Sequence, residues 1–293
     1  MRTICVAGLY INIKSADEAF FSSRFKNYEC EFSQNPDMTM KTEVLNCITA
    51  PEGEICFQKN RVCLLKLPDG RFCRYLKRTK TNEIVFMVTY SPDYSDVLIK
   101  ILNTLSIDGL GPTNYEYMYT GFMFANRLTV LGGTVLHGSS IALDGEGFVF
   151  SADSGTGKST HTNLWRQHFG KRVEIINDDK PAIKIENRKA FVYGTPWSGK
   201  TSLNKNVKHP LKAVVFLSRN EQNKIKKMDA VNAILNLSRQ LPNPFYDSEI
   251  GTKTVDFIKK LYEINTPVYD LECNISDNAV EVSYNGIFKG ELL

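Results

Sequence analysis

The segment Ser151-Ala-Asp-Ser-Gly-Thr-Gly-Lys-Ser-Thr160 constrains the fold of this chain more than any other, because it has the pattern of a phosphate-binding loop. The apolar residues 147–150 before it predict a buried strand, and residues 161–168 after it can continue as a helix. Glycines within the loop let consecutive backbone N–H groups point inward. A strand, such a loop and a helix in this order predict a nucleoside triphosphate site, with the positive end of the helix against the phosphates.

Each part of this loop has a predicted role in holding ATP and Mg²⁺. Lys158 is expected to reach the β- and γ-phosphates, and the hydroxyl of Ser159 is expected to hold the metal ion. Ala152 stands where the usual pattern has a glycine, and a small residue there still permits the turn. The residues predicted to bind the nucleotide are Asp153, Ser154, Gly155, Thr156, Gly157, Lys158, Ser159 and Thr160.

The composition is that of an ordinary soluble globular protein. The 293 residues can bury one large core or two modest ones, and 42% of them are hydrophobic while 23% are charged. The net charge of +4 comes without a concentrated basic run, so we expect neither nucleic acid nor a membrane as a partner. The seven cysteines form no C-x-x-C pair, and the first residues lack the apolar stretch of a signal peptide. We therefore expect a cytoplasmic protein with reduced cysteines.

The predicted elements divide the chain into a β-rich α+β domain at residues 1–125 and a catalytic α/β domain with a mixed sheet at residues 126–293. In the first domain we expect strands at 4–13, 54–58, 61–67, 71–77 and 83–90, a hairpin turn at residues 68–70, and helices at 94–105 and 115–128. In the second we expect strands at 134–136, 140–143, 147–150, 173–176, 182–185, 190–193, 212–217, 267–271 and 279–284, and helices at 158–169, 228–241 and 254–263. The basic residues 224–227 are expected to form an exposed loop.

Two adjacent carboxylates, Asp178 and Asp179, follow the predicted strand at 173–176. Phosphoryl transfer needs one acidic group for the Mg²⁺ that bridges the phosphates and another for the proton of the attacking hydroxyl. Successive side chains of an extended strand point to opposite faces, so both carboxylates can reach one site only if the strand has ended and the chain has turned. A polar turn that binds nothing is the alternative, and the phosphate-binding loop upstream favours the functional interpretation.

A further loop, Gly194-Thr-Pro-Trp-Ser-Gly-Lys-Thr201, follows the predicted strand at 190–193. Lys200 could neutralise charge on the transferring phosphoryl group, and Trp197 could wall off the acceptor. A surface loop with a packed tryptophan is an equally good interpretation, and the sequence leaves both open. His137 closes the apolar run 130–136, where a buried core histidine would also be common.

His137-Gly138, the run Ser154-Gly-Thr-Gly-Lys-Ser159 and Asn177-Asp-Asp179 together resemble the catalytic domain of bacterial HPr kinase/phosphatase, whose fold is related to phosphoenolpyruvate carboxykinase. The resemblance covers roughly residues 130 to 200 and rests on the order and spacing of the motifs. It implies a P-loop kinase domain of the HPr kinase/carboxykinase type. It also implies that His137 lies beside the acceptor hydroxyl, that Asp178 lies by the metal and that Asp179 is the general base.

The resemblance implies an ATP-dependent kinase that transfers the γ-phosphoryl group to a hydroxyl. Thr160 stands where the HPr enzymes usually have Glu, so the chain is more similar to the broader set of HPr-kinase-like proteins, which includes kinases of a peptide serine and kinases of small hydroxyl compounds. We expect a serine of a peptide or small protein as acceptor, because a β-rich domain can recruit a peptide by strand addition. A small metabolite as acceptor, a nucleotide-binding regulator without turnover and a homo-oligomer all stay open.

Overall fold

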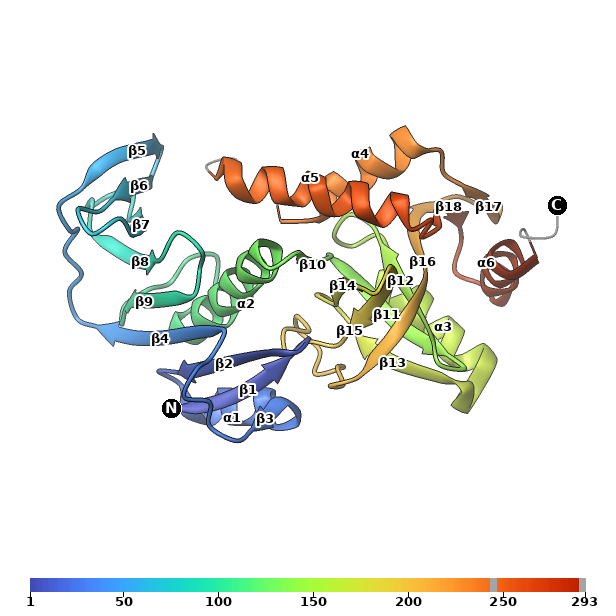
Figure 1. Ribbon diagram of the computed structural model, residues 1–293, viewed down its shortest axis with the longest axis horizontal. Helices are drawn as coiled ribbons and strands as arrows, with labels where there is room; N and C mark the ends of the chain where they lie inside the picture. The colour runs from blue at the N-terminus through green and yellow to red at the C-terminus, as the bar shows by residue number, and fades with distance from the viewer. Residues whose placement is uncertain (243–246, 290–293) are drawn as a thin grey trace. The chain divides into compact units, whose positions relative to one another are not determined.

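The computed structural model describes residues 1–242 and 247–289, which form a mixed α/β fold with large mixed sheets. The chain divides into two compact units, Met1–Val130 and Leu131–Leu293 (Figure 1). Within the described residues each unit is built on a sheet of nine strands. The predicted boundary between residues 125 and 126 falls inside α2 (Pro112–Val130), the last helix of the first unit.

The sheet of the first unit has the strand order β3-β1-β2-β4-β9-β8-β7-β6-β5. Its strands are β1 (Arg2–Val6), β2 (Leu9–Lys14), β3 (Glu29–Cys30), β4 (Met38–Leu45), β5 (Glu54–Lys59), β6 (Val62–Lys66), β7 (Phe72–Lys77), β8 (Ile84–Tyr90) and β9 (Asp96–Leu102), joined by the helices α1 (Glu18–Phe25) and η1 (Lys26–Tyr28) and followed by α2. Every residue of β8 is buried, as expected for a strand that is covered on both faces.

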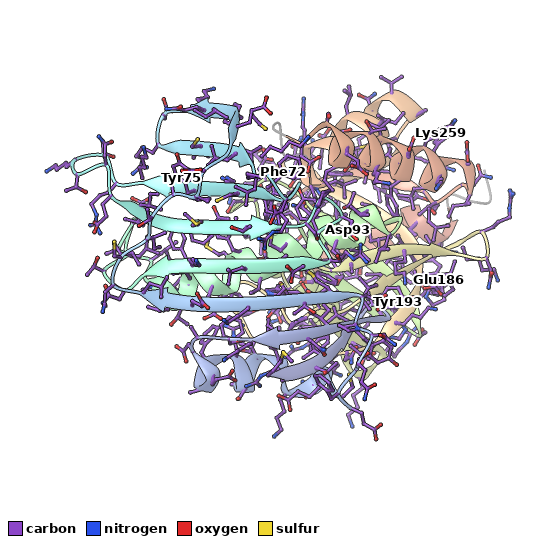
Figure 2. All side chains as sticks on the ribbon, turned by 60° about the vertical axis from the view of Figure 1, so that its left-hand side comes forward. Phe72, Tyr75, Asp93, Glu186, Tyr193 and Lys259 are labelled. Carbon is purple, nitrogen blue, oxygen red and sulfur yellow. The ribbon has the colours of Figure 1, made fainter. Side chains whose placement is uncertain are left out.

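Turn chemistry explains how the strands of this unit are joined. The predicted hairpin at residues 68–70 is confirmed, since Gly70 has a positive φ of 85° between the antiparallel strands β6 and β7. Figure 2 shows Phe72 and Tyr75 on β7, and the ring of Phe72 stacks on that of Tyr90 with centroids 5.9 Å apart. The run 4–13, predicted as one strand, is instead the hairpin of β1 and β2, turned at Ala7 and Gly8, which both have positive φ.

The helix predicted at residues 94–105 is wrong, because this segment contains the strand β9. The apolar residues Val97, Leu98, Ile101 and Leu102 fit helical spacing, but Ile99 between them is fully buried as well. β9 pairs in parallel with β4 and antiparallel with β8, so it lies inside the sheet, where β-branched residues pack well on both faces. The helix predicted at 115–128 is confirmed as α2.

The main sheet path of the second unit is β10-β14-β15-β16-β12-β11-β13, and β18 extends it from β16, with β17 beside β18. Its strands are β10 (Gly133–Val135), β11 (Gly138–Leu143), β12 (Glu146–Ser151), β13 (Val173–Asn177), β14 (Ala182–Glu186), β15 (Lys189–Tyr193), β16 (Lys208–Arg219), β17 (Lys224–Lys227) and β18 (Val268–Cys273). Its helices are α3 (Lys158–Phe169), η2 (Gly170–Arg172), α4 (Ala230–Gln240), α5 (Ser248–Glu263) and α6 (Asp277–Lys289). Glu186 and Tyr193, labelled in Figure 2, are hydrogen-bonded across the β14–β15 hairpin.

Strand direction places several carboxyl ends at one edge of this sheet. β12, β16 and β18 run parallel to one another. β11 is antiparallel to both β12 and β13, so β13 also runs in the direction of β12, and β11 begins at the edge where the others end. In open α/β sheets, ligands bind at the carboxyl ends of the strands. This edge is therefore the place to look for a site in the second unit.

Apolar side chains cover both faces of this sheet. Phe148 and Phe150 of β12 pack in a core with Trp165 of α3, while Val149 between them belongs to the core that includes residues of α4 and α5. Alternation along a strand sends neighbouring side chains to opposite faces, so β12 is buried on both. The strand before the loop is thus held rigidly.

Two expectations for the second unit are wrong. Residues 279–284, predicted as a strand, belong to α6, whose buried Ala279, Val280, Ser283 and Ile287 follow helical spacing. Residues 224–227, predicted as an exposed loop, form β17, which pairs antiparallel with β18.

None of the seven cysteines, all of which are among the described residues, forms a disulfide. No helix in the described ranges is both long enough and apolar enough to cross a bilayer.

Candidate functional site

The loop of residues 152–157 joins the end of β12 to the start of α3 at the carboxyl edge of the sheet. Gly155 has a φ of 79°, and Gly157, the residue that caps α3, has a φ of 122°. Other residues rarely adopt these conformations, so the two glycines are required by the shape of the loop. Apart from the neighbouring residues in the chain, no heavy atom of the described residues lies within 4 Å of an added Cβ at either glycine, so the space beside both is open to a ligand. The first amides of α3 have no partner within the helix and face an anion favourably.

Lys158, the first residue of α3, folds back over this loop. Its Nζ donates hydrogen bonds to the carbonyl oxygen of Ala152 at 2.9 Å and to that of Asp153 at 3.2 Å. Lys158 is only 9% exposed, and this burial lowers its pKa below the ordinary value for lysine. The carboxylates of Asp179, Asp153 and Asp178 oppose that shift, so the ammonium group lies in a field of negative charge.

A turn after β13 brings both predicted carboxylates toward the same side. The side chain of Asn177, which is fully buried, accepts hydrogen bonds from the backbone N–H of Asp179 at 2.9 Å and of Lys180 at 2.6 Å. This side-chain turn bends the chain at the end of the strand. Asn177 also donates to the carbonyl oxygen of Thr195 at 2.8 Å, which anchors the turn to the loop of residues 194–201.

The carboxylate of Asp178 is held by two hydroxyl groups. Ser139 Oγ donates to Oδ1 at 2.7 Å, and Thr201 Oγ1 donates to Oδ2 at 3.2 Å. Ser139 Oγ also lies 2.9 Å from Thr162 Oγ1 on α3. Asp178 is therefore linked through one hydroxyl to the helix that follows the glycine loop.

Asp179 pairs with His137, whose Nδ1 lies 3.1 Å from the carboxylate. The side chains are 34% exposed for His137 and 23% for Asp179, so a substrate can reach both. The backbone fixes the pair, since Gly138 N donates to the carbonyl oxygen of Asp179 at 3.0 Å and Ser151 Oγ donates to that of His137 at 2.7 Å. A carboxylate oriented by a histidine has the form of a general base.

The loop of residues 194–201 packs closely against this turn. A Cβ on Gly194 would lie 1.7 Å from the carbonyl oxygen of Lys205, and a Cβ on Gly199 would lie 3.2 Å from the carboxyl group of Asp179. Trp197 is 2% exposed and therefore belongs to the interior. Lys200 is exposed.

Three further polar residues near the site were not anticipated from the sequence. Ser139 and Thr201 hold Asp178, as described above. Arg219, the last residue of β16, donates from Nη2 to the carbonyl oxygen of Gly155 at 2.5 Å and from Nε to that of Thr156 at 3.2 Å. Arg219 could have been identified because it ends a strand that lies beside β12. That inference needs the order of the strands in the sheet, which the sequence does not give.

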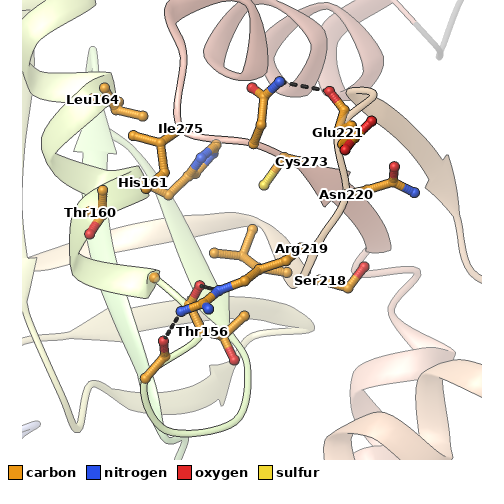
Figure 3. Close-up of a pocket in the computed structure, with 14 residues that line it drawn as sticks. Thr156, Thr160, His161, Leu164, Ser218, Arg219, Asn220, Glu221, Cys273 and Ile275 are labelled. Carbon is orange, nitrogen blue, oxygen red and sulfur yellow. Dashed lines mark hydrogen bonds between the residues drawn. The ribbon is translucent and has the colours of Figure 1, made fainter.

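A cavity of about 720 Å³ adjoins the glycine loop (Figure 3). It is lined by Gly155, Thr156, Gly157, Thr160, His161, Leu164, Leu217, Ser218, Arg219, Asn220, Glu221, Cys273, Asn274 and Ile275. A smaller hollow of about 410 Å³, which includes Asp153 and Ser154 in its lining, lies over the same loop. These volumes fall within or near the range of roughly 300–1,000 Å³ that is typical of small-molecule sites.

The chemistry of the donor groups fits magnesium held jointly with phosphates. Mg²⁺ prefers oxygen ligands and is usually bound through one or two carboxylates together with substrate phosphates. Asp178 and the exposed hydroxyl of Ser159 could supply such oxygens. No group of three or more His, Cys, Asp or Glu side chains able to hold a metal by itself occurs in residues 1–242 and 247–289.

Comparison with known proteins adds little to this geometry. No protein-family model matches the chain, and no curated protein matches its sequence. Among solved structures, the chain is similar to the HPr(Ser) kinase/phosphatase from Coxiella burnetii, with 13% sequence identity, a TM-score of 0.32, and coverage of 54% of this chain and 99% of that chain. A TM-score of this size carries no argument about fold or function.

Proposed function

We propose that this protein is an ATP-dependent kinase that transfers the γ-phosphoryl group to a hydroxyl. One observation carries the proposal: the glycine loop with its lysine and the two aspartates meet at one edge of the sheet. Ser139 Oγ joins the carboxylate of Asp178 to Thr162 Oγ1 of α3, the helix that begins at Lys158. A site for phosphate alone would have no need of two carboxylates beside it.

In the proposed reaction, the loop amides, the first turn of α3 and Lys158 bind the triphosphate. The acceptor oxygen forms a bond to the γ-phosphorus while the bond from that phosphorus to the bridging oxygen of ADP breaks. Asp179, oriented by His137, takes the proton of the hydroxyl. Mg²⁺, held by Asp178 and Ser159, would supply charge neutralisation on the phosphate oxygens. Positioning and electrostatics then provide most of the rate enhancement.

The spacing of the strands leaves room for this arrangement. β11 lies between β12, which leads into the loop, and β13, which leads into the carboxylates. Neighbouring strands are about 4.8 Å apart, so β12 and β13 are separated by roughly 9–10 Å. A terminal phosphoryl group and an incoming hydroxyl can fit between groups carried by strands at this separation.

For the acceptor, we propose a serine of a peptide or small protein. The support is β5 of the first unit, an end strand of its sheet with five of its six residues exposed. An end strand can bind an extended peptide through main-chain hydrogen bonds. A small hydroxyl compound is the second candidate acceptor, and Lys200 is proposed as an additional cation near the transferring group because its loop packs on Asp179.

An acceptor screen tests the proposal. The purified chain is incubated with γ-labelled ATP and fractionated host lysate, with Lys158→Ala and the exposed Lys171→Ala as paired variants. Label should enter a peptide, protein or metabolite fraction with the wild type and with Lys171→Ala, and should be absent with Lys158→Ala. Label that persists in Lys158→Ala would contradict the proposed site. Nucleotide binding without labelling of any fraction would favour a regulator over a kinase.

A further inference from the structure

The cavity of about 720 Å³ lies on the opposite side of the glycine loop from the two aspartates. Asp178 and Asp179 follow β13, which is reached from β12 through β11. The cavity is formed instead by residues at the ends of β16 and β18, reached from β12 in the other direction, together with residues of α3. A ligand whose phosphates occupy the loop could therefore extend into the cavity without approaching the carboxylates.

The walls of this cavity suit a flat, apolar group. Leu164, Leu217, Cys273 and Ile275 supply apolar surface, and Figure 3 shows the sulfur of Cys273 on the cavity side. The strand ends that form it are tied together, since Asn274 Nδ2 donates to the carbonyl oxygen of Glu221 at 2.7 Å. Figure 3 marks this hydrogen bond.

His161 is one of the polar residues that line the cavity. It is 3% exposed, and its ring extends from α3 into the space between α3 and Cys273 (Figure 3). Trp165 Nε1 lies 3.1 Å from His161 Nε2. The indole nitrogen is only a donor, so Nε2 must be the acceptor, and the hydrogen of the neutral ring lies on Nδ1. Among the described residues this buried Nδ1 has no hydrogen-bond partner.

A buried donor without a partner is unfavourable, and this one belongs to a residue that lines the cavity. We infer that the cavity binds the purine base of the donor nucleotide, with His161 Nδ1–H donating to a ring nitrogen of the base. This inference rests on the proposed function. Purine ring nitrogens are acceptors at the rim of a flat ring, and the apolar part of the cavity wall suits the faces of such a ring. Nδ1 is covered in this structure, so the contact requires a small adjustment of the cavity wall.

Comparison of ATP with inorganic tripolyphosphate, both with Mg²⁺, tests the inference. The wild type should bind ATP more tightly than tripolyphosphate and more tightly than CTP. His161→Phe should weaken ATP binding by about 3- to 10-fold, the effect of one lost hydrogen bond, and leave tripolyphosphate unchanged. His168→Phe, the same change at an exposed position of α3, should alter neither.

The outcomes separate the two proposals. If the wild type binds neither ATP nor tripolyphosphate, the proposed function fails together with the inference. If it binds both equally, or if His161→Phe leaves ATP binding intact, the base site alone is wrong. If CTP equals ATP, the assignment to a purine is wrong.

A second measurement uses the wild type and avoids any effect of substitution on folding. Cys273 is the one cysteine in the sequence of the second unit, while Cys30, Cys47 and Cys56 are exposed in the first. Saturating ATP should slow the labelling of Cys273 by a thiol reagent, measured by mass spectrometry, and leave the three exposed cysteines unchanged. Tripolyphosphate should not protect Cys273. Labelling of Cys273 that is unaffected by ATP would overturn the inference.

Discussion

The two sides of the glycine loop differ in how completely their polar groups are satisfied. On the carboxylate side, Asp178 accepts from two hydroxyl groups, Asp179 pairs with His137, and Asn177 braces the turn that carries both. On the cavity side, His161 keeps an unpartnered N–H within the described part of the chain.

This difference suggests that the polar groups on the two sides have different roles toward a ligand. Groups that act on a reacting atom are most effective when hydrogen bonds already fix their position. Groups that recognise a ligand gain most when a hydrogen-bonding position is left for the ligand to fill. We therefore expect substitutions on the carboxylate side to change the rate of transfer, and substitutions on the cavity side to change the binding of nucleotide.

The largest effect should follow from Asp179→Asn, which removes the proposed general base. Transfer of labelled phosphate to the acceptor should fall by about 10²- to 10⁴-fold, the usual contribution of general base catalysis, while ATP binding is retained. Asp144→Asn is the matched control, because Asp144 is exposed and paired with Arg172. A rate that falls by less than 10-fold would remove Asp179 from the role of base.

On the cavity side, we expect His161 to make the free energy of unfolding depend on pH. Burial lowers the pKa of His161 to about 4, from an ordinary value of 6.5. Between these values the unfolded chain binds a proton that the folded chain excludes, so stability is lost as pH falls from about 6.5 to about 4, by roughly 3 kcal/mol in all. His161→Phe should flatten this slope.

Both tryptophans, Trp165 and Trp197, belong to the second unit, so urea unfolding followed by their fluorescence measures the stability of that unit. Hydrogen bonds with lysines lower the pKa values of Glu174 and Glu186. Protonation of these carboxylates at low pH therefore destabilises the wild type and His161→Phe alike. An equal slope in the wild type and in His161→Phe would show that His161 is not buried as a neutral ring.

A smaller effect is expected from Gly199→Ala, which crowds the carboxyl group of Asp179. Transfer should slow by about 10- to 100-fold, since small displacements of reacting groups have effects of this size. Gly145→Ala is a close control, because Gly145 also has a positive φ but has open space around its Cβ position. Both variants should lose about 1–2 kcal/mol of stability from backbone strain, and equal rates in the two would refute the proposed crowding.

The smallest effect should come from Thr201→Val, which removes one hydrogen bond to Asp178. The Mg²⁺ concentration for half-maximal transfer should rise by about 2- to 10-fold, the effect of a single hydrogen bond. Thr252→Val in α5 removes an exposed hydroxyl that donates to the carbonyl oxygen of Ser248 in the same helix, and it should leave the Mg²⁺ dependence unchanged. No rise in Thr201→Val would separate Asp178 from the metal.

Local sequence signals predicted the elements around the loop well. α3 begins and ends at the expected residues, because two glycines stand before Lys158 and Gly170 follows Phe169. β9 was missed because Val97, Leu98, Ile101 and Leu102 satisfy helical spacing, and only pairing with β4 and β8 makes this segment a strand. α6 was missed because the short apolar run at 279–284 fits either structure.

Local sequence patterns likewise indicate some residues of the candidate site and miss others. The glycine loop and the aspartates carry patterns within a few residues, so the sequence could indicate them. The contact of Arg219 with Gly155, and the bond of Thr201 to Asp178, join residues far apart in the chain. His161 lies on the predicted helix, but its missing partner is a property of packing that no local pattern contains.

The contact of Lys158 with the carbonyl oxygens of Ala152 and Asp153 has a kinetic consequence. These carbonyl oxygens occupy Lys158 Nζ before the triphosphate binds. Binding then exchanges these hydrogen bonds for bonds to phosphate oxygens, and the loop does not have to become ordered. Capture then incurs little loss of conformational entropy. We expect single-step association and prompt release of the spent nucleotide, with no slow rearrangement between successive turnovers.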